Sequence, residues 1–154
     1  MGPPLLLKTI AMNEILTEML SNYGLSEITG DKHNPEILAF FAEIGFDWVK
    51  DDETAWCSAA LNFFAKKHGY ERSGKLDARS WLKVGELVLE PTMGDIVVFW
   101  RESYASWKGH VAIYINSNEK YIWCLGGNQN NSISITAYSR DRLLGYRRLK
   151  RLLG

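Results

Sequence analysis

Cys57 and His110 are the residues of this sequence whose types and settings best fit covalent chemistry. Cys57 lies at the expected start of a helix, where the helix dipole lowers a thiol pKa and favours the reactive thiolate. The main-chain N–H groups there lack partners within the helix and can hold an oxyanion. His110 follows Gly109 at the mouth of an apolar run, and histidine is the usual base for a thiol. We predict Cys57 as nucleophile and His110 as base.

Other interpretations of these residues stay open on the sequence alone. A free cysteine is often an inert, buried, small hydrophobic residue. The acidic residues 51–53 would raise the thiol pKa if they pointed at the sulfur, and a disulfide with Cys124 is an alternative. His33 and His68 are weaker candidates, since His33 precedes a helix start and His68 fits a helix end.

A third residue would orient the imidazole ring. Asn128 follows the strand expected to pair with the His110 strand, so we predict that its amide accepts the ring N–H. Gln129 is the alternative for this role, and otherwise we expect it to contact substrate. Gly-Gly-Asn is also ordinary turn chemistry, which is the competing interpretation of this segment.

The remaining predicted site residues would contact substrate. Trp56 and Trp107 could wall a cleft in which glycan or peptide stacks, and Arg79 could meet a substrate carboxylate. Gly127 and Gln129 complete this set. We expect neither a metal nor a cofactor, because the cysteines and histidines lack paired metal-ligand spacing.

Hydrophobic periodicity predicts helices first and strands second, hence an α+β fold with an antiparallel sheet of five or six strands. Apolar residues recur at helical spacing in two early segments, and a third helix carries Cys57. Short apolar or alternating runs after Pro91 predict the strands. The expected helices are 13–23, 35–44 and about 54–68, and the expected strands are 96–100, 111–115, 121–125, 132–136 and 144–147.

The composition is that of one soluble domain. The chain has 154 residues, with 18 basic and 18 acidic side chains and no net charge. Neither nucleic acid nor membrane is therefore an expected partner. The N-terminal segment has no basic region and too short an apolar stretch for a signal peptide. We expect synthesis in the cytoplasm without a classical signal.

Several ordered blocks together resemble the NlpC/P60 and CHAP superfamily of cysteine cell-wall hydrolases, in particular a phage- and effector-associated branch. The helix with Cys57 is followed by Gly-Asp-Ile-Val-Val-Phe and then by Gly-His-Val-Ala-Ile-Tyr. The resemblance covers nearly the whole chain. The matching blocks are 33–38, 51–57, 78–82, 94–99, 109–114, 125–129 and 143–147.

This resemblance implies a papain-like core in a single domain over 1–154, with a helical lead-in over 1–50 and a catalytic core over 51–154. It implies that Cys57 attacks an amide carbonyl of peptidoglycan and that His110 relays the proton. CHAP domains often carry Glu-x-Asn at the next strand end. Here Gly126 stands at the Glu position, so only Asn128 matches.

The resemblance leaves the cleaved bond open between a stem-peptide endopeptidase and an N-acetylmuramoyl-L-alanine amidase. It implies action at the cell wall or in the periplasm, after phage-type release or delivery by a secretion system. A toxin effector would also have an immunity protein as partner. Two alternatives are a non-catalytic wall-binding module and a thiol acyltransferase or protein peptidase of the same fold.

Overall fold

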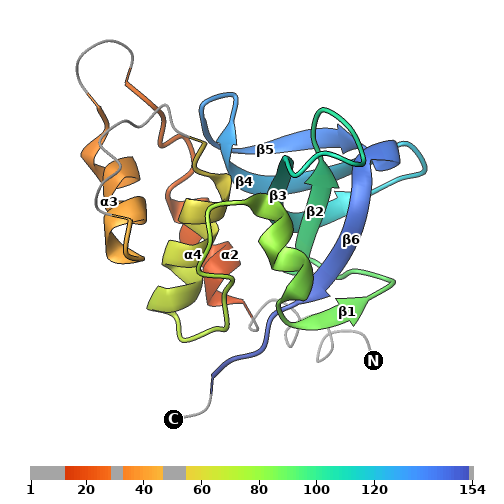
Figure 1. Ribbon diagram of the computed structural model, residues 1–154, viewed down its shortest axis with the longest axis horizontal. Helices are drawn as coiled ribbons and strands as arrows, with labels where there is room; N and C mark the ends of the chain where they lie inside the picture. The colour runs from red at the N-terminus through yellow and green to blue at the C-terminus, as the bar shows by residue number, and fades with distance from the viewer. Residues whose placement is uncertain (1–12, 29–32, 47–54, 153–154) are drawn as a thin grey trace.

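Three helices lie on one side of an antiparallel sheet in the computed structural model, which describes residues 13–28, 33–46 and 55–152 (Figure 1). The α+β class predicted from the sequence is therefore confirmed. The described helices are α2 (Glu14–Ser21), α3 (Pro35–Glu43) and α4 (Cys57–Lys67).

Local sequence explains where these helices begin. The Asn13 side chain accepts a hydrogen bond from the Leu16 main-chain N–H and caps α2. Asn34 caps α3 in the same way, with Pro35 in the first helical position. Helix α4 starts at Cys57 without a side-chain cap, so N–H groups at its start remain available for other acceptors.

All strand pairs of the six-stranded sheet are antiparallel, in the order β1-β6-β2-β3-β4-β5. The sequence predicted five of these strands and missed β1, which has three residues, two of them exposed, and therefore no clear pattern. Two short 3-10 helices, η1 (Ala78–Lys83) and η2 (Arg140–Arg142), complete the fold. The strands are β1 (Glu86–Val88), β2 (Ile96–Trp100), β3 (Gly109–Ser117), β4 (Tyr121–Gln129), β5 (Ser132–Ser139) and β6 (Leu143–Arg148).

The main core lies between α4 and the sheet. Helix α4 packs on β3 and β4, and α2 and α3 pack against α4. Leu61 and Phe64 of α4 are buried there, as their helical spacing predicts. A smaller apolar cluster, including Phe99 and Cys124, covers the opposite face of the sheet. The strands are thus buried on both faces, which explains their nearly continuous apolar runs.

A buried polar network fixes the first turn of α4. The Ser58 hydroxyl donates to the Lys75 carbonyl at 2.6 Å and accepts from the Trp81 indole at 2.9 Å. The Asn62 amide donates to the Lys75 carbonyl and accepts from the Gly74 N–H. Buried polar groups of this kind are costly unless all are bonded, so the network holds the start of α4 in one position.

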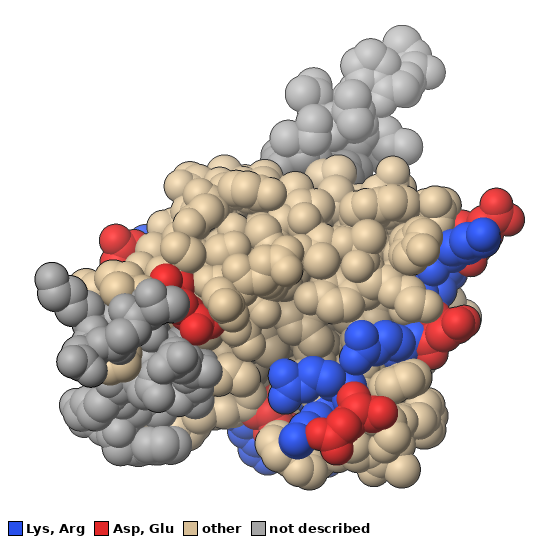
Figure 2. Space-filling model, turned by 90° about the horizontal axis from the view of Figure 1, so that it is seen from above, with Lys and Arg blue, Asp and Glu red and all other residues tan. Residues whose placement is uncertain are grey.

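Charged side chains are unevenly placed on the molecule. On the face seen from above, basic and acidic groups lie along the margins and the middle is uncharged (Figure 2). Inside the fold, Arg148 of β6 makes two bonds of 2.8 Å to the buried Asp95 carboxylate. Asp95 thus has a structural role. None of the described helices is both long and apolar enough to cross a membrane.

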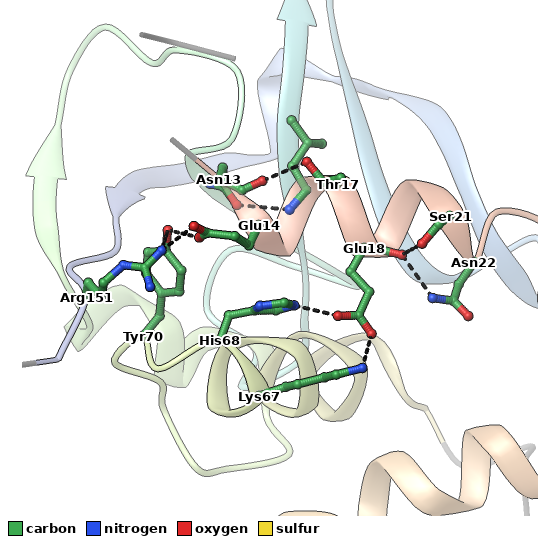
Figure 3. Close-up of polar contacts among 11 residues, drawn as sticks. Asn13, Glu14, Thr17, Glu18, Ser21, Asn22, Lys67, His68, Tyr70 and Arg151 are labelled. Atoms are coloured by element: carbon green, nitrogen blue, oxygen red, sulfur yellow. Dashed lines mark hydrogen bonds and ion pairs between the residues drawn. The ribbon is translucent and has the colours of Figure 1, made fainter. Parts of the chain in front are cut away.

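Helices α2 and α4 are joined by ion pairs on their outer side (Figure 3). The Glu18 carboxylate binds the Lys67 ammonium at 2.6 Å and also the His68 ring. Nearby, Glu14 contacts Tyr70 and Arg151 (Figure 3). These contacts link the chain's early helix to both the end of α4 and the C-terminal segment.

Glu18→Gln is expected to lower the free energy of unfolding by about 0.5–1 kcal/mol at neutral pH. Burial raises the pKa of Glu18, but the bonds from Lys67 and His68 lower it more, so its pKa lies below the usual value. The contribution is therefore present at neutral pH and is lost as the pH falls through that lowered pKa. Denaturant unfolding at neutral and acid pH measures both effects.

The matched control is Glu119→Gln, in the exposed turn between β3 and β4. It should leave stability nearly unchanged at both pH values. A Glu18→Gln effect that persisted undiminished at acid pH would contradict an ionic origin.

Candidate active site

Cys57 is the first residue of α4 and is 6% exposed. Its position places the sulfur at the positive end of the helix dipole. The thiol lines one cavity with the His110 ring. Hydrogen bonding by that ring and by the main chain at Ser58 and Val111 acts to lower the pKa of the thiol. Both cysteines are free, so the alternative of a Cys57–Cys124 disulfide is wrong.

His110 lies on β3, opposite Phe99 of β2, and is 8% exposed. The strand begins two residues earlier than predicted, so His110 is held inside the ladder rather than before it. Its ring Nε2 lies 2.9 Å from Oε1 of Gln129. The other ring nitrogen, Nδ1, is therefore the one left for the thiol.

The Gln129 amide has only one orientation that satisfies its surroundings. Its Nε2 donates to the carbonyl oxygens of Cys124 and Ser134, at 3.2 and 2.6 Å. Its Oε1 must then face the imidazole, and it also accepts a long bond from the Cys124 thiol. His110 Nε2 is consequently the donor, which leaves Nδ1 free to exchange a proton with Cys57. Gln129 is 1% exposed, so it has no surface for the substrate contact predicted for it.

The bond to the imidazole that the sequence assigned to Asn128 is thus made by Gln129. A β-bulge explains the difference. The β4–β5 register slips between Gly126 and Gln129, and Asn128 has a left-handed φ of 58°. Regular alternation would put Asn128 on the same face as Cys124, but one inserted residue turns Gln129 to that face instead.

Gly126 and Gly127 make this bulge possible, because a side chain at either position would collide with its neighbours. A Cβ on Gly126 would lie 2.7 Å from the Gln129 Oε1, so the missing side chain leaves room for the orienting amide. A Cβ on Gly127 would lie 2.6 Å from the Trp56 ring. Gly127 is therefore buried and packs against Trp56 at the start of α4, whereas the sequence predicted that it contacts substrate.

Cys57 and His110 shift each other's protonation. Burial raises the pKa of the Cys57 thiol, but the charge and hydrogen bond of His110 outweigh it and hold that pKa below its usual value. Burial lowers the pKa of His110, but Cys57 and the bond from Gln129 raise it above its usual value. The two groups titrate as one pair, and both shifts are in the direction of thiolate with imidazolium.

Tyr138 of β5 is a site residue that the sequence analysis missed. Its ring stacks on His110 with centroids 4.9 Å apart, and on Phe99 at the same distance. Burial raises the pKa of its hydroxyl, so it stays neutral. Stacking restricts the imidazole to one plane. The alternating residues 132–136 predicted a strand just before Tyr138. The contact between Tyr138 and His110, however, depends on the order of the strands in the sheet.

A cavity of about 120 Å³ opens at the thiol and the imidazole. That volume fits a reacting carbonyl group rather than a sugar. Asn128 lines it, although it makes no bond to His110, and among the described residues no carboxylate side chain lines it. The lining residues are Cys57, Phe99, Trp100, Arg101, His110, Asn128, Tyr138 and Arg142.

The remaining predicted substrate contacts lie elsewhere. Trp56 is 0% exposed and donates its indole N–H to Glu27 at 2.9 Å, so it is core and offers no stacking surface. Arg79 donates to the carbonyl oxygens of residues 103, 104 and 108, so its guanidinium holds that loop rather than a substrate. Trp107 is 70% exposed on the same loop and does not line the cavity.

Metal-binding groups do not assemble near the site. Within residues 13–28, 33–46 and 55–152, no three side chains of His, Cys, Asp or Glu come close enough to hold an ion. The acidic residues 51–53, which the sequence placed before Cys57, lie outside the described residues. The described chemistry is therefore that of a thiol, an imidazole and an amide.

The fold is similar to that of a solved structure described as "similar to lipoprotein, NLP/P60 family" from Staphylococcus aureus subsp. aureus Mu50. The two have a TM-score of 0.51 and 19% sequence identity, over 92% of this chain and 41% of that chain. This chain thus spans less than half of the protein it matches. No family model and no curated protein matches the sequence. The likeness shows an NlpC/P60-like fold.

Proposed function

We propose that this chain hydrolyses amide bonds of peptidoglycan by cysteine nucleophilic catalysis. One observation carries the proposal: Cys57, His110 and Gln129 form a series in which the thiol and the imidazole line one cavity and the imidazole donates to the Gln129 amide oxygen at 2.9 Å. A thiol with a lowered pKa, a base and a group that orients the base are the elements of a nucleophilic triad. A binding module has no use for such a series.

The chemistry follows from the protonation of the pair. The Cys57 thiolate attacks the amide carbonyl carbon, and N–H groups at the start of α4 hold the oxyanion. The C–N bond breaks as His110 gives its proton to the leaving amine, which leaves a thioester on Cys57. Water then attacks the thioester, His110 takes a proton from that water, and the acid is released with the thiolate restored.

Two observations support peptidoglycan as the substrate class. The ordered sequence blocks resemble cell-wall hydrolases, and the fold is similar to that of a protein described as NLP/P60 family. The cleaved bond is then a stem-peptide amide or the N-acetylmuramoyl-L-alanine bond. The proposal includes action at the cell wall after delivery by a phage-type or secretion-type route, with an immunity protein as partner in the second case.

Digestion of purified sacculi tests the proposal and identifies the bond. The protein should release new amino groups, and mass spectrometry of the soluble fragments should locate them. An amidase exposes the amino group of L-alanine, and an endopeptidase exposes one within the stem. Binding to sacculi without new amino groups would contradict hydrolysis. Fragments carrying a transferred acyl group would instead indicate an acyltransferase.

A further inference from the structure

Two arginines stand at the cavity that contains the thiol. Arg101 directly follows β2, and Arg142 ends η2; both line the same cavity as Cys57 and His110. None of the other described lining residues is acidic. Among the residues that the structure describes, these two cations are therefore an excess of positive charge at the site.

Arg142 is held in place by its neighbours. Its Nε donates to the Trp100 carbonyl oxygen at 3.2 Å, and its guanidinium lies over the Trp100 ring at 5.2 Å. The hydrogen bond uses the Nε edge of the Arg142 guanidinium, and the Trp100 ring covers one of its faces. Its two terminal nitrogens have no hydrogen-bond partner among the described residues, so they remain available for a ligand.

Arg101 is anchored through its main chain and free at its side chain. Its N–H donates to the Lys108 carbonyl, while the neighbouring Glu102 pairs with the Lys108 ammonium rather than with Arg101. The charge of Arg101 also acts on Glu102, but it lowers the pKa of that carboxyl less than Lys108 does. The same charge is close enough to lower the pKa of His110. An anion bound there would therefore also offset an unfavourable charge beside the base.

We propose that Arg101 and Arg142 together bind a free carboxylate of the substrate, beside the amide that Cys57 attacks. Guanidinium groups pair with carboxylates through two parallel hydrogen bonds. The cavity is large enough only for the reacting group, so the carboxylate lies at its rim, where the arginines stand. This inference rests on the proposed amide hydrolysis and assigns the residues that select among its substrates.

The test uses two synthetic wall peptides that differ only in their carboxyl groups, which are free in one and carboxamides in the other. For the unaltered protein, kcat/KM should be at least about tenfold higher for the free acid. In the double variant Arg101→Gln/Arg142→Gln this ratio should fall to near one, mainly through KM. Each single variant should give an intermediate ratio.

Arg140→Gln is the matched control, because Arg140 belongs to the same short helix as Arg142 but does not line the cavity. It should keep the full preference for the free acid. Equal rates for the two peptides, or a preference that survives in the double variant, would overturn the assignment.

A second readout separates this inference from the proposed function. Calorimetry measures the affinity of both peptides for the Cys57→Ala protein, which needs no turnover. Turnover of both peptides with equal affinity would overturn the carboxylate site and leave hydrolysis standing. A lack of Cys57-dependent turnover would overturn hydrolysis, while the affinity ratio would still decide the carboxylate site.

Discussion

Cys57→Ala is expected to abolish hydrolysis of peptidoglycan, with a loss on the order of 10⁴-fold or more in kcat. The Cys57 sulfur lines the cavity and is the atom that forms the covalent intermediate in the proposed reaction. The change removes a single buried atom, so the free energy of unfolding should fall by only about 1 kcal/mol. Turnover of sacculi and thermal unfolding, measured on the same preparation, check the two parts together.

Alkylation by iodoacetamide gives an independent measurement of the same thiol. Cys57 lines the cavity and has a lowered pKa, so the native protein should be labelled there below the usual pH of thiol reactivity. Cys124 is 0% exposed and burial raises its pKa, so it is the internal control and should react only after unfolding. In His110→Ala the charge and hydrogen bond of the ring no longer lower the pKa of Cys57, so its labelling should move to higher pH.

Labelling of Cys124 before Cys57 would contradict the proposed nucleophile. So would Cys57→Ala protein that digests peptidoglycan at the normal rate. An unchanged pH dependence in His110→Ala would show instead that the imidazole does not control the thiol.

The parts of the site that local sequence predicted are those that depend on one element at a time. Cys57 at a helix start follows from the helix pattern, and His110 at a strand follows from the apolar run after it. Neither pattern says that the two elements meet. They do so because α4 packs across β3, and the resemblance, rather than the periodicity, implied that contact.

The imidazole is bonded by Gln129 rather than by the predicted Asn128, and local sequence patterns could not predict this difference. Strand alternation is a rule of period two, and a single inserted residue reverses it. The bulge could be located only from the pairing of β4 with β5, where Gly126 opposes Ser134 and Gln129 opposes Ser132. Gly-Gly-Asn in the sequence marks irregular backbone, but the direction of the slip follows from the partner strand.

The cavity rim depends still more on tertiary structure. Arg142 reaches Trp100 because β6 pairs with β2, with Phe99 opposite Leu143. Tyr138 of β5 reaches His110 of β3 although β4 lies between them in the sequence. Trp56 illustrates the reverse case: its place beside Cys57 predicted a cleft wall, but its ring points into the core, against Gly127. Adjacency in sequence does not determine which way a side chain faces at a helix start.

Gln129→Met is expected to lower kcat on the order of 10²–10³-fold with little change in KM. Methionine fills a similar volume, but its sulfur is only a weak acceptor for the His110 N–H and it cannot donate to the two carbonyl oxygens. The bond from Gln129 raises the pKa of His110, so its loss should lower that pKa. The alkaline limb of the kcat/KM profile, where the imidazolium loses its proton, should therefore move to lower pH.

The matched control is Asn128→Gly, which removes the neighbouring amide and suits the left-handed φ of 58° at that position. Asn128 lines the cavity without bonding His110, so its removal should leave the alkaline limb in place. Gln129→Met is expected to lose stability as well, because two buried carbonyl oxygens lose their donor. A purely structural role would lower stability without moving the pH profile. If the alkaline limb of the kcat/KM profile moved in Asn128→Gly and not in Gln129→Met, Asn128 would be the residue that orients the imidazole.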